Sequence, residues 1–262
     1  MLAGIGLMPH GNPVLDPPDK ETRKLAEVLK NIGKAFADVD AYVLISPHNV
    51  RMSEHLGVVM AENLISWLGF DGVELPGEWR TDRELAEEIY ERARKEGFPV
   101  VDLHFASRSG EYSRWPLTWG ELIPLQFLEK KPLVLLTPAR NLSRETLIKF
   151  GETLGEVLEE SDKSAALIVS ADHGHAHDEN GPYGYRRESG EYDRLIMELI
   201  NEDRLEELLK IPDELIRKAL PDSYWQMLIM LGVMHRVEVE LKGSAYACPT
   251  YFGMAGALWV RE

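Results

Sequence analysis

Two apolar segments that each end in a Pro-His pair constrain the fold of this chain most strongly. Residues 2–8 are apolar and run into Pro9-His10, and residues 41–46 are apolar and run into Pro47-His48. Between them, residues 20–36 place apolar side chains at helical spacing. A strand, a helix and a second strand in this order form a βαβ unit, whose two strands are parallel. The pattern therefore predicts an α/β fold with a mostly parallel central sheet flanked by helices.

The rest of the chain continues the alternation of helices and strands. Further helices are predicted at 82–97, 143–160, 191–201, 204–209, 213–219 and 223–234, and further strands at 98–103, 132–137, 165–170, 235–241 and 248–260. We find no internal repeat and no linker rich in Pro, Gly or Ser. A chain of 262 residues with this pattern is expected to form one domain, residues 1–262.

Composition excludes several classes of partner. The chain carries 29 basic and 44 acidic residues, a formal net charge of −15. A surface this negative repels phosphate backbones and anionic lipids, so nucleic-acid and membrane binding are not expected. A lone Cys248 forms no intrachain disulfide, and no run approaches the ~18 apolar residues of a membrane span. A cytoplasmic protein is therefore expected, since no secretory signal pattern is present either.

Histidines gather at the ends of predicted strands. His10 and His48 follow the first two strands, and the segment Asp172-His173-Gly174-His175-Ala176-His177-Asp178 follows the strand at 165–170. Ligands of open parallel sheets bind beyond the carboxyl ends of the strands, so the fold can collect these imidazoles at one edge. Two histidines and one carboxylate are a typical ligand set for Fe(II), and imidazole also suits zinc. The alternative for any single histidine is a loop residue bonded to the backbone.

Four segments in this order resemble a known family. They are Met8-Pro9-His10-Gly11-Asn12-Pro13, Ser46-Pro47-His48-Asn49, the His-rich turn leading into Gly181-Pro182, and the helix at 224–232. They resemble the class III extradiol ring-cleavage dioxygenases, the family of the catalytic subunit of protocatechuate 4,5-dioxygenase, and more distantly the Memo-like proteins. The resemblance implies a non-haem Fe(II) enzyme of aromatic compound catabolism that cleaves a catechol-type ring with dioxygen. It also implies a homo-oligomer or assembly with a small second subunit.

The resemblance implies roles for individual histidines. His10 and His48 match the two imidazole ligands of the iron. His177 lies four residues before Gly181-Pro182, as the family's acid/base histidine does. The looser match to Memo-like proteins, through the segment that starts at Ser170, assigns the same role to His175 instead. Both histidines remain candidates.

The sequence departs from the family pattern at two places. A gap-free match puts Ser223 on the family's carboxylate ligand, and Asp222 lies one residue earlier. Asp222 is the expected third ligand if the helix entry is shifted by one residue, and its alternative role is an N-cap. Trp119 stands where relatives carry a substrate-contacting histidine, and the nearby Glu121 is expected at the surface.

Two other functions compete with the dioxygenase. The segment Asp172-His173-Gly174 also resembles the metal-binding turn of alkaline-phosphatase-like enzymes, which implies a metal-dependent phosphohydrolase. A Memo-like protein that is non-catalytic, or that holds another metal such as zinc, is the second alternative, with Cys248 as a candidate ligand.

Several side chains near the histidines are candidates for substrate contact. Tyr183 and Tyr185 follow the His-rich turn and offer aromatic or hydrogen-bonding contacts to a ring. An anionic aromatic substrate needs local positive charge in so acidic a protein, and Arg51, Arg186 and Arg187 are the candidates.

Overall fold

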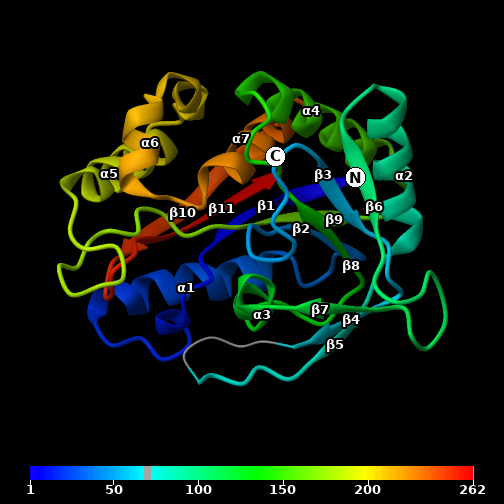
Figure 1. Cartoon of the computed structure of the whole chain (residues 1–262), viewed down its shortest axis with the longest axis horizontal. Helices are drawn as coiled ribbons and strands as arrows, with labels where there is room; N and C mark the ends of the chain where they lie inside the picture. Colours follow the sequence, from blue (N-terminus) through cyan, green and yellow to red (C-terminus); the bar gives the residue numbers. More distant parts are fainter. Residues whose placement is uncertain (68–71, 262) are drawn as a thin grey trace.

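The computed structural model describes residues 1–67 and 72–261, and its main element is an eight-stranded sheet (Figure 1). The strand order is β10-β11-β1-β9-β2-β8-β3-β6. The strands are β1 (Leu2–Met8), β2 (Ala41–Ile45), β3 (Leu56–Val59), β6 (Val100–Leu103), β8 (Leu133–Thr137), β9 (Ala165–Ser170), β10 (Val239–Ala247) and β11 (Met254–Arg261).

The middle of this sheet is parallel, and its strand order is not the order in the sequence. Strands β1, β9, β2 and β8 are parallel neighbours, while β11 pairs antiparallel with β1. Strand β9 lies between β1 and β2, with Met8 opposite Ser170 and Ile45 opposite Val169. The α/β class with a mostly parallel sheet is thereby confirmed. The insertion of β9 brings the segment after residue 170 between the ends of the two N-terminal strands.

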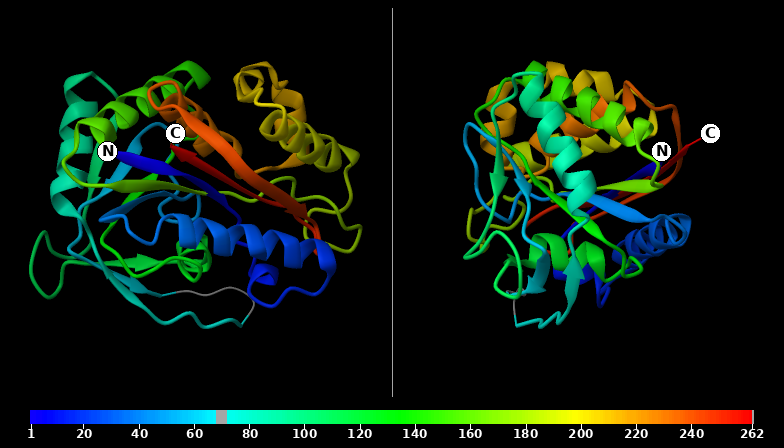
Figure 2. Two further views of the ribbon diagram at one scale, coloured as in Figure 1. Left: turned by 180° about the vertical axis from the view of Figure 1, so that it is seen from behind. Right: turned by 90° about the vertical axis from the view of Figure 1, so that its right-hand side faces the viewer.

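Helices cover both faces of the sheet, as Figures 1 and 2 show. Side chains of β2 alternate between two cores: Val43 and Ile45 pack toward α4 and α7, whereas Tyr42 and Leu44 pack toward α1. A sheet buried on both faces explains why its strands read as continuous apolar runs. Among the described residues, no helix is long and apolar enough to cross a bilayer. The helices are α1 (Lys20–Ala35), α2 (Arg83–Lys95), α3 (Trp119–Leu125), α4 (Arg144–Glu160), α5 (Arg187–Asn201), α6 (Asp213–Ala219) and α7 (Tyr224–Met234), with short 3-10 helices at Asn12–Val14 and Leu205–Lys210.

A second, three-stranded sheet and one helix were not predicted from the sequence. The small sheet has the order β5-β4-β7, and lies with α3 on the α1 side of the molecule (Figure 1). Its strands have three or four residues, too few to display a periodic pattern. The strands are β4 (Asn63–Ser66), β5 (Glu78–Arg80) and β7 (Arg114–Leu117).

The two C-terminal strands exist but are displaced from the predicted ranges 235–241 and 248–260. The first of them, β10, continues to Ala247. It is an edge strand whose exposed positions carry polar residues such as Glu240 and Lys242, so its apolar pattern ends before the strand does. The apolar stretch from residue 248 begins as a loop, and β11 starts only at Met254. This loop returns to the end of β9, where the amide of His173 donates to the carbonyl of Gly253 over 2.8 Å.

Candidate metal centre and its cavity

The ends of β1 and β2 bring two histidines together from positions 38 residues apart. His10 follows β1 and is buried, and His48 follows β2 and remains partly open. Their ring centroids lie 4.5 Å apart in an edge-to-face arrangement. The sequence predicted this edge of the sheet as the ligand site because parallel strands end on the same side.

Asp222, two residues before the start of α7, supplies a carboxylate between the two rings. Its Oδ2 atom lies 2.8 Å from His48 Nε2 and 3.2 Å from His10 Nε2. One donor atom from each of the three residues falls within 4.8 Å of the others. Ser223 occupies the N-cap position of α7, and its hydroxyl makes no capping bond but exchanges a hydrogen bond with the Tyr192 hydroxyl. Two imidazole nitrogens and a carboxylate oxygen facing one point form a donor set suited to a divalent transition metal.

The proton of His10 is placed by a hydrogen-bond chain behind the ring. The Ser170 hydroxyl donates to the carbonyl of Gly120, so its oxygen is left to accept from His10 Nδ1 over 2.9 Å. The Nδ1–H form leaves the lone pair on Nε2, the atom that faces Asp222. Burial also lowers the pKa of His10 to about 4, against the attraction of Asp222. His10 is therefore a neutral imidazole with its free nitrogen directed at the site.

Two buried carboxyl groups, those of Asp172 and Asp222, lie in this region and differ in protonation state. Burial and the neighbouring charge of Asp222 raise the pKa of Asp172 well above its usual value. Burial acts on Asp222 as well, but the charges and hydrogen bonds of His10 and His48 outweigh it and hold the pKa of Asp222 well below its usual value. The amide of Asp172 also donates to Asp222 Oδ1 over 3.0 Å, which fixes the carboxylate plane. Asp222 is therefore the ionised member of the pair.

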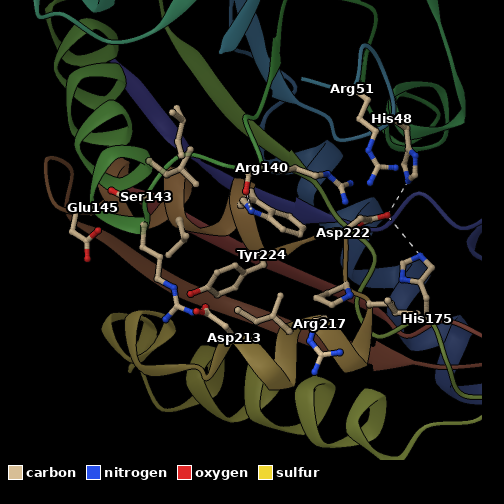
Figure 3. A pocket seen from close by; sticks show the side chains of 18 of the residues that line it. His48, Arg51, Arg140, Ser143, Glu145, His175, Asp213, Arg217, Asp222 and Tyr224 are labelled. Atoms are coloured by element: carbon tan, nitrogen blue, oxygen red, sulfur yellow. Dashed lines mark hydrogen bonds and ion pairs between the residues drawn. The ribbon is translucent and has the colours of Figure 1, made fainter. Parts of the chain in front are cut away.

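His175 lies beside the three donors. Its Nε2 atom is 3.7 Å from Asp222 Oδ2, and Figure 3 shows His48 and His175 on either side of this carboxylate. Its Nδ1 atom donates to the carbonyl of His173 over 2.6 Å, so Nε2 carries the lone pair that points into the site. The ring stacks on Phe252 with 5.6 Å between centroids, which restricts its rotation.

His177 belongs to a different group of side chains. Its Nε2 atom lies 2.8 Å from Asp193 Oδ2, which also accepts from the Tyr246 hydroxyl over 2.6 Å. Burial opposes a charge on His177, but the hydrogen bond to Asp193 outweighs it and raises the pKa to about 10. The other oxygen of Asp193 accepts from the amide of Gly174 over 2.7 Å. Asp193 thus anchors both ends of the turn that carries His175.

The remaining candidates of the His-rich turn and the lone cysteine lie outside the three-donor group. The ring of His173 is fully buried beside Tyr192, and neither ring nitrogen has a hydrogen-bond partner among the described residues. Burial lowers the pKa of His173, so it packs as a neutral ring. Cys248 donates to the carbonyl of Thr250 over 3.5 Å and interacts with His177.

The start of α3 lies against His48. Glu121 in the first turn of this helix is fully buried, whereas the sequence predicted it at the surface. Its carboxyl accepts from the amide of Thr118 over 2.7 Å, and the Thr118 hydroxyl donates to the carbonyl of His48. A Cβ on Gly120 would lie 2.7 Å from the Cβ of His48, so the close approach requires glycine. The ring of Trp119 lies 4.9 Å from that of His48. The capping box between Thr118 and Glu121 was the signal in the sequence that could have revealed this helix.

A cavity of about 880 Å³ opens from the donors toward α4 and α6 (Figure 3). Its inner end is formed by His48, His175 and Asp222, and its walls carry both apolar and basic side chains. Besides Tyr183, its lining includes Leu142, Leu147, Ile216, Leu220, Tyr224, Trp225, Leu228, Arg51, Arg140, Arg144 and Arg217.

Of the substrate contacts expected from the sequence, two line this cavity and three do not. Tyr183 and Arg51 do. Tyr185 and Arg187 line a separate hollow beside α5, and Arg186 donates to the carbonyl of Lys218. Arg140, Arg144 and Arg217 could not be predicted as cavity residues, because they come from loops and helices far from the histidine motifs.

Comparisons with known proteins show the fold and the family of the chain. The chain is 23% identical over 264 residues to Protein CA_C1420 of Clostridium acetobutylicum, covering 97% of this chain and 56% of that protein, so it spans just over half of that relative's length. The crystal structure of the uncharacterized protein JW3007 from Escherichia coli K12 matches with a TM-score of 0.64 and 14% identity, over 98% of this chain and 99% of that chain, which shows a shared fold. The family model described as the catalytic LigB subunit of aromatic ring-opening dioxygenase matches residues 4–258. The chain therefore belongs to this LigB family of class III extradiol ring-opening dioxygenases.

Proposed function

We propose that this protein is a non-haem Fe(II)-dependent extradiol dioxygenase that cleaves the ring of a catechol-type aromatic with dioxygen. In this proposal His10, His48 and Asp222 hold the metal. The observation that carries it is the convergence of two imidazole Nε2 atoms on one carboxylate oxygen, 2.8 and 3.2 Å away, at the inner end of a large cavity. Membership of a ring-opening dioxygenase family supports the same chemistry.

The donor set fits a metal of this kind. The pKa of His10 is lowered and that of Asp222 is lowered, so the nitrogen is unprotonated and the carboxylate is charged near neutral pH. When bound there, Fe(II) supplies adjacent positions for the two oxygens of a vicinal diol and for dioxygen. Zinc fits the same three donors and is the alternative metal.

We assign the acid/base role to His175 rather than to His177. The Nε2 lone pair of His175 faces the region where a metal-bound diol would lie, because Nδ1 is bonded to the carbonyl of His173. His175 would accept the proton of one substrate hydroxyl and return it later in the reaction. His177 has its Nε2 atom bonded to Asp193 and would act by holding the turn. Tyr183 and Trp119 would contact the ring from the cavity wall and from beside His48.

Two observations disfavour the alternative functions. A phosphohydrolase of the two-metal class needs a second ion about 3.5–4 Å from the first. Among the described residues, one group of three His, Cys, Asp or Glu side chains has donors close enough to share an ion, and His173 is not in it. For the Memo-like alternative, Cys248 lies with His177 and the loop carbonyl of Thr250, outside that group.

The test is oxygen consumption by protein purified and loaded with Fe(II) under anaerobic conditions. We expect one iron per chain and consumption of oxygen together with a new ring-opened product for at least one member of a panel of vicinal aromatic diols. His48→Ala is expected to lose both the iron and the activity, whereas the matched control His55→Ala, an exposed histidine, is expected to keep both. Phosphate release from an aryl phosphate without oxygen uptake would instead support the hydrolase. A folded, iron-loaded protein that consumes oxygen with none of the diols would contradict the proposal.

Three wider expectations complete the proposal. We propose that residues 1–262 act as one catalytic domain, because donors from residue 10 and residue 222 meet at one site. We also propose a cytoplasmic location, and a homo-oligomer or a small second subunit as partner. Gel filtration with light scattering, and fractionation of the source cells, test these expectations.

A further inference from the structure

Two arginines lie next to each other beside the metal donors. Arg51 follows β2 and Arg140 follows β8, and a parallel bridge between Met52 and Ala139 holds their segments together. The amide of Arg140 donates to the carbonyl of Met52 over 3.4 Å, which continues that bridge. Figure 3 shows both guanidinium groups pointing toward the same part of the cavity, close to Asp222 and His48.

The charge of this pair is not neutralised by a salt bridge within the described part of the chain. No carboxylate there lies within 4.0 Å of either guanidinium, although the chain has 44 acidic residues against 29 basic ones. The neighbouring Arg144, in contrast, is paired with Asp213. Burial and the charge of Arg51 lower the pKa of Arg140, against the attraction of Asp222. Arg51 is exposed and Arg140 is partly buried, so an anion that enters the cavity meets two positive charges that no carboxylate of the described residues screens within salt-bridge distance.

The orientation of Arg140 suits a ligand in the cavity. Its guanidinium carbon lies 4.6 Å from the centroid of the Trp225 ring, so one flat face of the group is covered by the indole. This stacking fixes the plane of the fork and leaves the N–H edges free to donate. A planar fork held in this way is suited to binding two oxygens of one anionic group.

We propose that Arg51 and Arg140 form an anion subsite that binds an oxyanion substituent, a carboxylate or a phosphoryl group, on the aromatic substrate. This inference rests on the proposed function, because it places the anionic group on a ring whose diol faces His48 and Asp222. The subsite then selects charged catechols over neutral ones and orients the ring before reaction. The apolar walls at Ile216 and Leu220 accommodate the uncharged part of the molecule.

The test compares two ligands that differ only in charge. Calorimetry on the full, Zn(II)-loaded chain measures the affinity of 3,4-dihydroxybenzoate and of its methyl ester, which keeps the ring and the diol. We expect the acid to bind about 10-fold or more tightly than the ester. The double variant Arg51→Gln/Arg140→Gln is expected to lose about 10-fold or more in affinity for the acid, and less than about 2-fold for the ester. Arg140→Lys keeps the positive charge but loses the planar guanidinium, and its affinity for the acid is expected to lie between those of the parent and the double variant.

Arg217→Gln is the matched control, because it removes one positive charge from the same cavity at an exposed position on α6. We expect its affinities to stay within about 2-fold of those of the parent. Equal affinity for acid and ester in the parent, or an equal loss in Arg217→Gln and the double variant, would overturn the subsite.

A second arm on the metal-free chain separates this inference from the proposed function. Benzoate and inorganic phosphate carry no diol, so their binding does not depend on the metal. We expect one of them to bind the parent and to lose about 10-fold or more in affinity in the double variant. The tighter of the two identifies the substituent as a carboxylate or a phosphoryl group. If the double variant binds benzoate and inorganic phosphate no more weakly than the parent does, the subsite is refuted, whether or not the protein consumes oxygen.

Discussion

Asp193 offers the sharpest test of how the turn that carries His175 is held. Its carboxylate accepts three hydrogen bonds, from the amide of Gly174, the hydroxyl of Tyr246 and Nε2 of His177, at 2.6 to 2.8 Å. The change Asp193→Asn keeps the shape but replaces one accepting oxygen with an NH₂ group. Whichever way the amide turns, a donor faces a donor at one of the three partners.

The magnitude follows from these contacts. A buried donor left without an acceptor costs about 1–3 kcal/mol, and the bond to a charged His177 contributes about 1.5–3 kcal/mol. We therefore expect Asp193→Asn to lower the free energy of unfolding by about 3 kcal/mol at pH 7.

The loss depends on pH with a defined sign. The folded pKa of His177 is about 10, raised above its ordinary value of 6.5. The stabilisation by its charge is therefore complete below pH ~6.5 and disappears as the pH rises through about 10. The difference between parent and variant is expected to shrink to about 1 kcal/mol at pH 10.5.

Urea unfolding at both pH values measures the two free energies. Asp178→Asn is the control, because this exposed aspartate in the same loop bonds the amide of Asn180 and is expected to change stability by less than ~0.5 kcal/mol. If Asp193→Asn is as destabilising at pH 10.5 as at pH 7, His177 does not carry the charge assigned to it. If it behaves like Asp178→Asn at pH 7, the carboxylate does not hold the turn.

Three further predictions concern the site itself. Ser170→Ala removes the acceptor that fixes the Nδ1 proton of His10, and we expect about 10- to 100-fold weaker metal binding in a chelator competition. His175→Ala is expected to keep the metal and lose turnover by ~100-fold or more, whereas His177→Ala is expected to keep most turnover and lose stability, as iron content, kinetics and thermal melting will show. Gly120→Ala places a Cβ 2.7 Å from that of the neighbouring histidine, and we expect a loss of about 1–3 kcal/mol in chemical unfolding together with weaker metal binding.

Much of the fold could be read from the sequence because the central strands are buried on both faces. The runs that form β1, β2, β8 and β9 are continuously apolar, and α1 and α4 show strong helical periodicity with Asp19 and Ser143 as N-caps. Short elements escaped prediction, since β5 has three residues and α3 has seven with Pro124 inside. The edge strand β10 was misplaced because most of its side chains are only partly buried and two, Glu240 and Lys242, are charged and exposed, so it shows no continuous apolar run.

The sequence by itself determined that His10, His48 and the His-rich segment would stand at strand ends, because each follows an apolar run directly. It did not determine which of them would meet. The insertion of β9 between β1 and β2 decided that, and it depends on pairing between strands more than 100 residues apart in the sequence.

Only the tertiary structure decided the finer assignments. Asp222 and Ser223 are adjacent in the sequence, and the entry angle of α7 directs the carboxylate of Asp222 to the imidazoles and the hydroxyl of Ser223 to Tyr192. His175 and His177 differ by two residues and would share one face of a regular strand. The segment 173–176 is irregular instead, and His175 lies beside Asp222 whereas His177 is bonded to Asp193. Local sequence fixes which groups a segment carries, but their direction depends on contacts with distant segments, which no local pattern encodes.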